Sequence, residues 1–271
     1  MYKITQRQEL APTLKKYVVA APMIARRAQP GQFVILRVHE QGERIPLTIA
    51  DFDREAGTIT LVFQEVGRST RLLGKLEEGD SVLDLLGPLG EPTCHPQGKF
   101  AVCIGGGVGI APVYPEAKAL SQNGYHVISI IGARTGELLF FEEEMAAVSE
   151  RLYIATDDGS KGHHGFVTDV LQKLIDEGQQ IDFVIAVGPI PMMKAVADLT
   201  RKYEIKTIVS LNSMMVDGTG MCGGCRVTVG GEVKFTCVDG PSFDAHLLDF
   251  DEQMRRLSMY KDMEKLAEVE E

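Results

Sequence analysis

The stretch Lys99-Phe-Ala-Val-Cys-Ile104-Gly105-Gly-Gly-Val-Gly109-Ile-Ala-Pro112 decides the fold of this chain. Its first six residues are mostly apolar and predict a buried strand, and a helix is expected after the glycines, as far as about Asn123. A strand, a glycine-rich turn and a helix in this order allow a backbone to approach a pyrophosphate at the helix N-terminus. The alternative interpretation is that the glycines only permit tight packing of the helix on the strand, with no ligand.

Strand-like and helix-like segments then alternate as far as Leu211. The predicted strands are His126–Ile131, Leu152–Thr156, Asp182–Val187 and Lys206–Leu211. The predicted helices between them are Glu137–Val148, Phe166–Asp176 and Pro191–Tyr203. Repeated strand–helix units of this kind indicate a parallel sheet with helices on both faces.

The residues that follow these strands are candidates for ligand binding, because open α/β sheets bind ligands beyond the carboxyl ends of their strands. The acidic residue that commonly holds a ribose hydroxyl after the second strand is absent, and Gly132-Ala-Arg134 stands there instead. The pattern therefore differs from the dehydrogenase fingerprint. Asp157 and Asp158 can either touch a ligand or shape a turn, and for each alone a turn is favoured.

The segment before Gly87-Pro-Leu-Gly90 has a different pattern, with short β runs separated by turns. Its predicted strands are Lys16–Ala20, Phe33–Val38, Leu47–Asp51, Thr58–Glu65 and Ser81–Leu86. Many short strands without a long helix predict a small antiparallel barrel. Two motifs here carry chemistry. The first is Arg44-Ile-Pro46-Leu-Thr48, and the second is Gly67-Arg-Ser69-Thr70 before a short helical pattern, which suits an anion or a plain N-cap.

A cysteine-rich segment follows Leu211. It reads Met214-Met-Val-Asp-Gly-Thr-Gly-Met-Cys222-Gly-Gly-Cys225 and ends at Thr236-Cys237, after an expected hairpin with Gly230-Gly231 at its tip. Thiolates at this spacing can hold an iron–sulfur cluster or zinc, whereas a glycine-rich turn with incidental cysteines is the plain alternative. Cys94 and Cys103 stand apart, and Cys103 is expected to be an inert core residue.

The composition limits the class of protein. A chain of 271 residues is long enough for two compact domains, and its net charge of -10 argues against nucleic acid and anionic membranes as partners. No apolar run approaches the ~18 residues of a membrane helix, and the N-terminus is too polar for a signal peptide. A cytoplasmic location is therefore expected, in which disulfide bonds are uncommon.

The order of these motifs resembles the ferredoxin–NADP reductase superfamily. Within it the chain is similar to an iron–sulfur flavoprotein group. This group contains the electron-transfer subunit of dihydroorotate dehydrogenase and the small subunit of NADH-dependent reduced ferredoxin:NADP oxidoreductase, also called the sulfide dehydrogenase β subunit. The resemblance covers nearly the whole chain.

The resemblance implies FAD on the barrel and a nicotinamide nucleotide, NAD(H), on the α/β domain. Arg44 would contact the pyrophosphate, and Thr48 would hydrogen-bond near the reactive flavin nitrogen. The other flavin contacts would be Pro46, Leu47, Val62, Phe63, Gln64, Gly67, Ser69 and Thr70. The nicotinamide nucleotide would meet Gly105, Gly106, Gly107, Val108, Gly109, Ala111 and Pro112, with Arg134, Asp157, Gly188 and Pro189 at neighbouring strand ends.

The resemblance also implies a [2Fe–2S] cluster on Cys222, Cys225 and Cys237. The dihydroorotate dehydrogenase subunit has four cysteines, the first of which lies five positions before the one that matches Cys222, and Asp217 stands at that first position here. The small subunit of the ferredoxin:NADP oxidoreductase is similar to this chain in having aspartate there. Asp217 is therefore expected to be the fourth ligand.

The domains implied are a flavin-binding β-barrel at 1–95, an NAD(H)-binding α/β domain at 96–211, a [2Fe–2S] segment at 212–240 and a helical tail at 241–271. The implied function is electron transfer between NAD(H) and a larger iron–sulfur flavoprotein subunit of an electron-bifurcating complex, which ferredoxin would reach through that complex. The alternatives are the dihydroorotate dehydrogenase subunit, a diaphorase subunit of a hydrogenase or sulfur reductase, and a zinc-containing nucleotide-binding protein. Arg134 could meet the 2′-phosphate of NADP, whereas the resemblance favours NAD.

Overall fold

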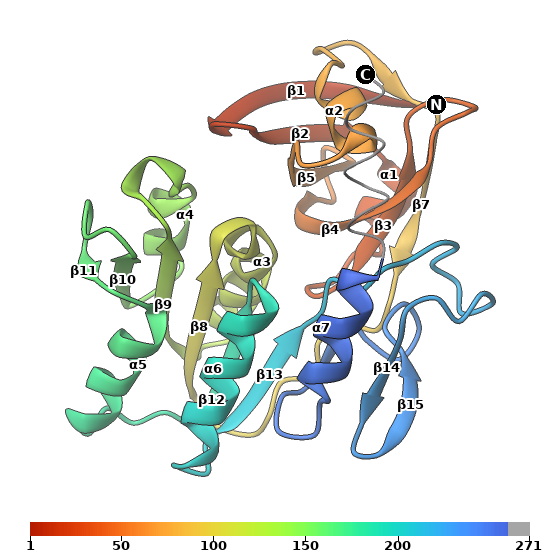
Figure 1. Ribbon diagram of the computed structural model, residues 1–271. Helices are drawn as coiled ribbons and strands as arrows, with labels where there is room; N and C mark the ends of the chain where they lie inside the picture. Colours follow the sequence, from red (N-terminus) through yellow and green to blue (C-terminus); the bar gives the residue numbers. More distant parts are fainter. Residues whose placement is uncertain (260–271) are drawn as a thin grey trace. The chain divides into compact units, whose positions relative to one another are not determined.

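The computed structural model describes residues 1–259, which form two compact units (Figure 1). The barrel unit contains Met1–Pro92, Asn212–Pro241 and the described residues 249–259. The α/β unit contains Thr93–Leu211 and Ser242–Leu248. The cysteine segment thus belongs to the same unit as the barrel. Among the described residues, no helix has both the length and the apolar character needed to cross a membrane.

The barrel unit is built on a seven-stranded antiparallel sheet in the order β6-β1-β2-β5-β4-β3-β7. The strands are β1 (Tyr2–Ala11), β2 (Leu14–Ala20), β3 (Phe33–Arg37), β4 (Arg44–Asp53), β5 (Thr58–Gln64), β6 (Ser81–Val82) and β7 (Asp84–Leu89). The two edge strands, β6 and β7, are separated in the chain only by Leu83, whose N–H donates to the Arg37 carbonyl at 3.1 Å. The two edges therefore meet, the sheet is nearly closed, and the predicted antiparallel barrel is confirmed.

The inner face of the barrel is apolar. Tyr17 and Phe63 pack edge to face with ring centroids 5.0 Å apart, among Ile4, Val19, Leu36, Ile59 and Leu61. Strand β1 was missed by the sequence prediction, because most of its side chains are polar and only Ile4 and Ala11 are buried. Helix α1 (Pro22–Ala25), a single turn, was missed as well.

The α/β unit has a seven-stranded sheet in the order β11-β10-β9-β8-β12-β13-β16. The strands are β8 (Phe100–Gly106), β9 (His126–Ala133), β10 (Arg151–Thr156), β11 (His163–His164), β12 (Phe183–Val187), β13 (Lys206–Ser210) and β16 (Ser242–Asp244). All neighbouring pairs are parallel except β13 and β16, which are antiparallel. The chain runs outward from β8 to β10 and then returns to β12 on the other side of β8, which makes the boundary between β8 and β12 a topological switch point.

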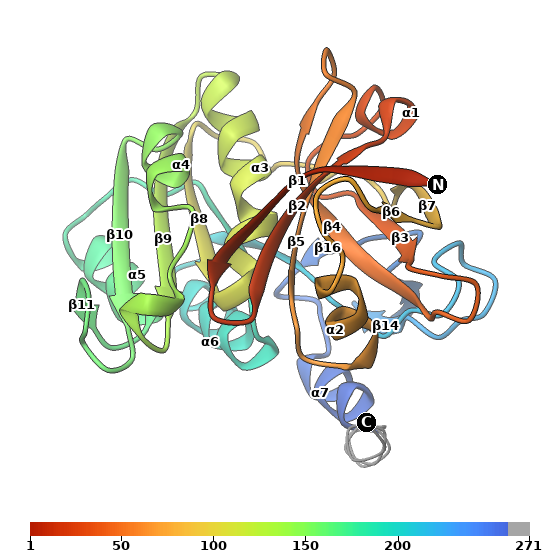
Figure 2. The same cartoon turned by 90° about the horizontal axis from the view of Figure 1, so that it is seen from above.

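Helices cover both faces of this sheet, as predicted (Figure 2). Helix α3 (Ile110–Gln122) packs beside α4 (Glu142–Ala147), and α5 (Val167–Asp176) packs beside α6 (Ile190–Arg201). The helix predicted at Glu137–Val148 is shorter than expected. A 3₁₀ turn, η2 (Gly136–Leu138), precedes an irregular buried stretch, and Phe141 is left-handed with a φ of 57°. The rings of Phe140 and Phe141 pack in the core, so burial takes precedence over the helical pattern there.

The region after the cysteine segment divides between the units. Strands β14 (Arg226–Val229) and β15 (Glu232–Phe235) form the expected hairpin, and α7 (Phe250–Ser258) is the described part of the expected helical tail. The tail boundary at 241 differs from the structure, because β16 joins the α/β sheet and Ser242–Leu248 belongs to that unit. The remainder of the expected tail, 260–271, lies outside the described residues.

Gly109 gives a direct test of the packing at the switch point. A Cβ at Gly109 would lie 2.2 Å from the carbonyl oxygen of Val187, a backbone atom of a central strand. Gly107, in the short 3₁₀ turn η1 (Gly107–Gly109), has a φ of 54° and open space around the same position.

We therefore expect Gly109→Ala to lower the free energy of unfolding by about 2–3 kcal/mol, because the clash forces the backbone to move. Gly107→Ala should cost only about 1 kcal/mol, the penalty for a left-handed alanine. Urea unfolding of the two apo-proteins, followed by circular dichroism, measures the difference. An equal or larger loss for Gly107→Ala would contradict the packing role of Gly109.

Candidate functional site

The cysteine segment packs directly on the barrel. Cys225 and Cys237 are both buried and share an apolar cluster with Phe33 and Ile35 of β3, with Leu89 of β7 beside them. Gly218 fits against the same strand with a φ of 77°, and a Cβ there would come within 2.6 Å of the Ile35 side chain. The glycine is therefore required both by the left-handed backbone and by the close approach of the loop to β3.

Two of the thiols already lie together. The Sγ atoms of Cys225 and Cys237 are 3.2 Å apart, which is too far for a disulfide bond of about 2.05 Å. Two thiolates on one tetrahedral metal at about 2.3 Å each lie roughly 3.8 Å apart, more than the observed separation, so a small outward shift of the two thiols would let them share one metal ion. Burial raises the pKa of the Cys237 thiol to about 12, so metal binding there would release a proton.

Asp217 and Cys222 form a second, exposed pair. The Cys222 N–H donates to Asp217 Oδ2 at 3.0 Å, and the Thr219 N–H donates to Asp217 Oδ1 at 2.7 Å. Hydrogen bonds from Cys222 and Thr219 hold the pKa of the Asp217 carboxyl below its usual range. The carboxylate is therefore charged and lies beside Cys222. From this position Asp217 can either bind a metal or stabilise the turn through its hydrogen bonds.

Backbone N–H groups surround the thiols. The Gly224 N–H points at Cys222 Sγ and the Cys237 N–H at Cys225 Sγ, both at 3.4 Å. Such donors stabilise negative charge on cluster sulfurs. Within residues 1–259, no three His, Cys, Asp or Glu side chains are arranged to hold a single metal ion. The candidate ligands form two pairs, Asp217 with Cys222 and Cys225 with Cys237, as suits a cluster of two irons in which each iron takes two protein ligands.

The predicted flavin contacts on β4 and β5 lie where these strands separate. Pairing between them ends at Ile49 and Leu61, because Arg44–Thr48 pairs only with β3 and Val62–Gln64 only with β2. Beyond this point the edge of β4 that would face β5, and the edge of β5 that would face β4, are both unpaired. Pro46, which has no N–H to leave unpaired, suits such an edge. A planar ring bound here would find backbone donors and acceptors from both strands.

The individual side chains differ in their availability. Arg44 is exposed, and Pro46, Leu47, Thr48 and Gln64 are partly exposed. Phe63 is only 2% exposed and packs on Tyr17, so its side chain belongs to the barrel core and only its backbone can meet a ligand. Alternation explains this difference, because successive residues of β5 face opposite sides of the sheet.

Helix α2 (Arg68–Gly74) follows Gly67 as expected, and its hydroxyl groups already have partners. Gly67 is the N-cap residue, and Thr70, at the third position of the helix, accepts from the Gly67 N–H through Oγ1 at 3.0 Å, so neither Ser69 nor Thr70 is the N-cap itself. Ser69 Oγ donates to the Glu43 carboxylate at 2.5 Å. A phosphate at this turn would therefore compete with Glu43 for Ser69, and Gly67 and Thr70 would contribute mainly by shaping the turn.

The predicted nucleotide residues meet at one edge of the α/β sheet. Gly106 ends β8 and Gly188 follows β12, so both border the switch point. Gly105 and Gly109 are explained by packing, since a Cβ at Gly105 would lie 2.8 Å from the Ile110 backbone. Gly107 faces open space, which leaves its backbone accessible to a ligand. The remaining loop residues Val108, Ala111 and Pro112 lie in η1 and the first turn of α3, and Pro189 precedes α6.

Met192 is a residue at this edge that the sequence did not indicate. A Cβ at Gly106 would lie 2.3 Å from its Sδ atom, and a Cβ at Gly188 would lie 2.8 Å from its Cε atom. Its thioether thus covers both glycines at the switch point. In the sequence Met192 is only a methionine in the first turn of a predicted helix, a common feature of helices that pack in a core, so it did not indicate a role at the site.

The loops after β9 and β10 are tied to each other. Asp158 Oδ1 accepts from the Ser160 N–H and hydroxyl, and these bonds hold the pKa of the Asp158 carboxyl below its usual range. Ser160 Oγ in turn accepts from the Gly136 N–H at 2.7 Å. Asp158 therefore shapes a turn. Arg134 and Asp157 are exposed at this sheet edge, where a ligand can reach them.

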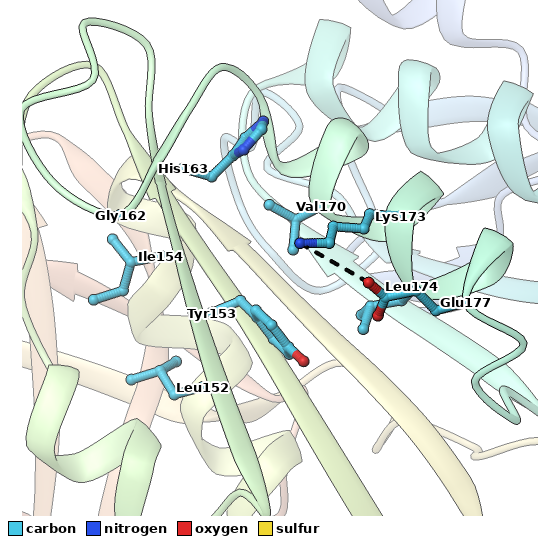
Figure 3. A pocket seen from close by; sticks show the side chains of 9 residues that line it. All are labelled: Leu152, Tyr153, Ile154, Gly162, His163, Val170, Lys173, Leu174 and Glu177. Atoms are coloured by element: carbon cyan, nitrogen blue, oxygen red, sulfur yellow. Dashed lines mark ion pairs between the residues drawn. The ribbon is translucent and has the colours of Figure 1, made fainter.

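A surface hollow of about 400 Å³ lies elsewhere on the α/β unit, between β10 and α5 (Figure 3). Leu152, Tyr153 and Val170 line it, and Lys173 and Glu177 form an ion pair at 3.9 Å at its side. None of the residues predicted for cofactor binding lines this hollow. It is therefore not part of the candidate site.

Two family descriptions match the chain. Residues 212–249 match the iron–sulfur cluster binding domain of dihydroorotate dehydrogenase B, and residues 103–198 match an oxidoreductase NAD-binding domain. A dihydroorotate dehydrogenase B electron transfer subunit homolog from Thermotoga maritima is 44% identical over 265 residues, spanning 98% of this chain and 93% of the relative. The chain belongs to this family of electron transfer subunits.

Other relatives agree with the assignment to this family. The dihydroorotate dehydrogenase B electron transfer subunit of Geobacillus thermodenitrificans is 37% identical, with 90% of this chain and 96% of the relative covered. A structure from a study of flavin-based electron bifurcation by the NADH-dependent reduced ferredoxin-NADP oxidoreductase is 42% identical. It superposes with a TM-score of 0.94, covering 100% of this chain and 97% of that one. A ferredoxin NADP+ reductase from Neisseria gonorrhoeae, at 22% identity and a TM-score of 0.62 over 74% of this chain and 89% of that one, shows the shared fold alone.

The family establishes the general role of the chain. It is the electron-transfer subunit of an NAD-linked flavin and iron–sulfur oxidoreductase, and the predicted FAD, iron–sulfur and NAD(H) cofactors are confirmed. Its relatives are named as subunits, which implies a larger partner. The individual ligand residues remain predictions. Cys103 is fully buried, as expected, and burial raises the pKa of its thiol, whereas Cys94 is exposed.

Asp217 as the fourth iron ligand leads to a spectroscopic prediction. Replacing Asp217 with Cys should retain the cluster but change its visible and paramagnetic spectra, because a carboxylate is a harder ligand than a thiolate. Cys94→Ser and Cys103→Ser are the controls and should leave iron content and spectra unchanged. A silent Asp217→Cys variant together with iron loss in either control would reduce Asp217 to a turn residue.

Proposed function

We propose that this chain is the NAD(H)-handling subunit of an electron-bifurcating NADH-dependent reduced ferredoxin:NADP oxidoreductase. The observation that carries the proposal is Asp217, which occupies the position of the first cluster cysteine of the dihydroorotate dehydrogenase subunits and lies 3.0 Å from the Cys222 N–H. The 42% identical structure from the bifurcation study supports it. The partner is a larger iron–sulfur flavoprotein subunit, and ferredoxin delivers electrons to the complex through that partner.

The bound cofactors supply the redox chemistry: a flavin exchanges hydride with a nicotinamide and single electrons with an iron–sulfur cluster. The residues of this chain bind and orient these groups. Arg44 neutralises the pyrophosphate, while Pro46, Leu47 and Thr48 line the flavin ring. The Thr48 hydroxyl hydrogen-bonds near the reactive nitrogen. No general acid or base is needed from the protein, because hydride transfer moves proton and electrons together.

The surface around Cys222 supports docking of the partner. Val216, Met221 and Val238 are 60%, 90% and 44% exposed, and Cys222 itself is exposed between them in the chain. Exposed apolar side chains gathered on one loop region are unusual on a free surface and common where a second protein binds. A partner that covers these exposed side chains would bring its own electron acceptor close to the cluster and exclude water from the site.

A second candidate is the electron-transfer subunit of a dihydroorotate dehydrogenase. The names of the relatives at 44% and 37% identity favour it, and Asp217 opposes it. A diaphorase subunit of a hydrogenase or sulfur reductase has no specific observation in its favour. The zinc-containing nucleotide-binding protein is disfavoured by the match of residues 212–249 to an iron–sulfur domain.

The native complex distinguishes the two candidates. Purification of the untagged protein from its own cells identifies the second subunit by mass spectrometry. We expect NADP reduction that requires NADH and reduced ferredoxin together, since bifurcation couples the two donors. Dihydroorotate-dependent NAD reduction by the same complex would overturn the proposal in favour of the second candidate.

Nucleotide preference is a further prediction. We expect NADH to bleach the oxidised flavin at least about tenfold faster than NADPH, a difference of roughly 1.4 kcal/mol in activation free energy. Rapid mixing with each reduced nucleotide measures it. Arg134→Gln is the matched variant: it should slow the residual NADPH reaction more than the NADH reaction, because the exposed guanidinium can meet the 2′-phosphate that only NADPH carries. A faster reaction with NADPH would reverse the assignment.

A further inference from the structure

Helix α7 is joined to the cysteine loop by a buried chain of hydrogen bonds. Gln253 Nε2 donates to Ser213 Oγ at 2.7 Å, Ser213 and Thr236 share a hydrogen bond of 2.8 Å, and Thr236 Oγ1 donates to the Cys225 carbonyl at 2.9 Å. Gln253, Ser213, Thr236 and Cys225 are at most 4% exposed. The Thr236 hydroxyl is committed to the carbonyl, so Ser213 donates to Thr236 and the chain runs in one direction, from α7 to Cys225.

The same helix places a positive charge on the loop. Arg256 Nη2 donates to the Gly224 carbonyl at 2.8 Å. Arg226 Nη1 donates to the Gly223 carbonyl at 3.4 Å. The carbonyls of both residues between Cys222 and Cys225 therefore accept a hydrogen bond from a guanidinium. Glu252, one turn before Arg256, accepts from the Thr228 N–H of β14 at 3.1 Å. The carboxylate is thereby engaged with the hairpin, while Arg256 is engaged with the cysteine loop.

The orientation of one peptide group links the charge of Arg226 to a thiol. The peptide unit that joins Gly223 and Gly224 has the Arg226 guanidinium at its carbonyl and Cys222 Sγ 3.4 Å from its N–H. A cation at the oxygen polarises the unit and makes the N–H a stronger donor to sulfur. Arg256 binds the next carbonyl, that of Gly224, from 32 positions away in the sequence, and so places a second guanidinium on the loop between Cys222 and Cys225.

We propose that α7 raises the reduction potential of the cluster, with Arg256 as the positioning residue that carries the charge. This inference rests on the proposed iron–sulfur site. Three thiolates and a carboxylate leave the oxidised cluster negative, and reduction of one ferric ion to ferrous by a single electron adds a further negative charge. A fixed cation stabilises the reduced form more than the oxidised form.

The test is a potentiometric titration of the purified, cluster-loaded chain, followed by visible absorption and paramagnetic resonance, with iron content measured in parallel. Arg256→Met removes the charge and the donors, Arg256→Gln removes the charge alone, and Arg256→Lys retains the charge. Arg255→Met is the matched control, because Arg255 is the exposed neighbour on the same helix and loses the same charge.

We expect the equilibrium constant for one-electron reduction to fall about tenfold in Arg256→Met and Arg256→Gln, a shift of about 59 mV to lower potential. Arg256→Lys should stay near the wild type, and Arg255→Met should be indistinguishable from it. Equal potentials for Arg256→Met and Arg255→Met would overturn the inference. So would loss of iron from both Arg256→Met and Arg256→Gln, because Arg256 would then serve assembly.

Failure of the proposed iron–sulfur site, on which the proposed function depends, gives a different result. A wild-type chain without iron and acid-labile sulfide would remove the cluster itself, whatever the variants do. A wild-type chain with a normal cluster and no response to Arg256 leaves the cluster in place and removes only the role of α7. The two failures are therefore separated by the iron analysis of the unmodified protein.

Discussion

The packing of the cysteine segment on β3 is the contact on which the candidate site depends. Phe33 and Ile35 belong to the strand that pairs with the part of β4 predicted to bind flavin, and the same two side chains pack against Cys225 and Cys237. The strand therefore lies between the two predicted cofactor sites. Because all of these residues lie within the barrel unit, the position of the cysteines relative to the predicted flavin strands is set by one apolar core and by the backbone of Gly218.

The order of the elements followed from the sequence because each had a local signature. Alternating strands and helices predicted the α/β sheet, and the spacing of Cys222, Cys225 and Cys237 predicted a metal centre. The errors occurred where burial in three dimensions overrode local pattern. The run that ends in Phe140 and Phe141 looks helical but is held in the core as irregular chain, and β1 looks polar because most of its side chains face water.

Other features had no local signature at all. Phe63 was placed beside the flavin by resemblance, yet its position in the alternation of β5 puts its ring in the core. Met192 covers Gly106 and Gly188 only because β8 and β12 are neighbours at the switch point, a relation that the fold creates. The contacts of Gln253 and Arg256 with the cysteine loop likewise join residues far apart in the chain, so only a structure could reveal them.

Strand β16 has a consequence for how the protein is made. The chain passes between the two units four times, at 92–93, 211–212, 241–242 and 248–249. The edge of β13 is covered only when Ser242–Asp244 pairs with it, and these residues follow the whole cysteine segment in the chain. During synthesis on the ribosome, the α/β sheet must therefore wait, with one edge open, until Cys222, Cys225 and Cys237 have already emerged. Cys222, Cys225 and Cys237 thus all leave the ribosome before the α/β unit can complete its sheet.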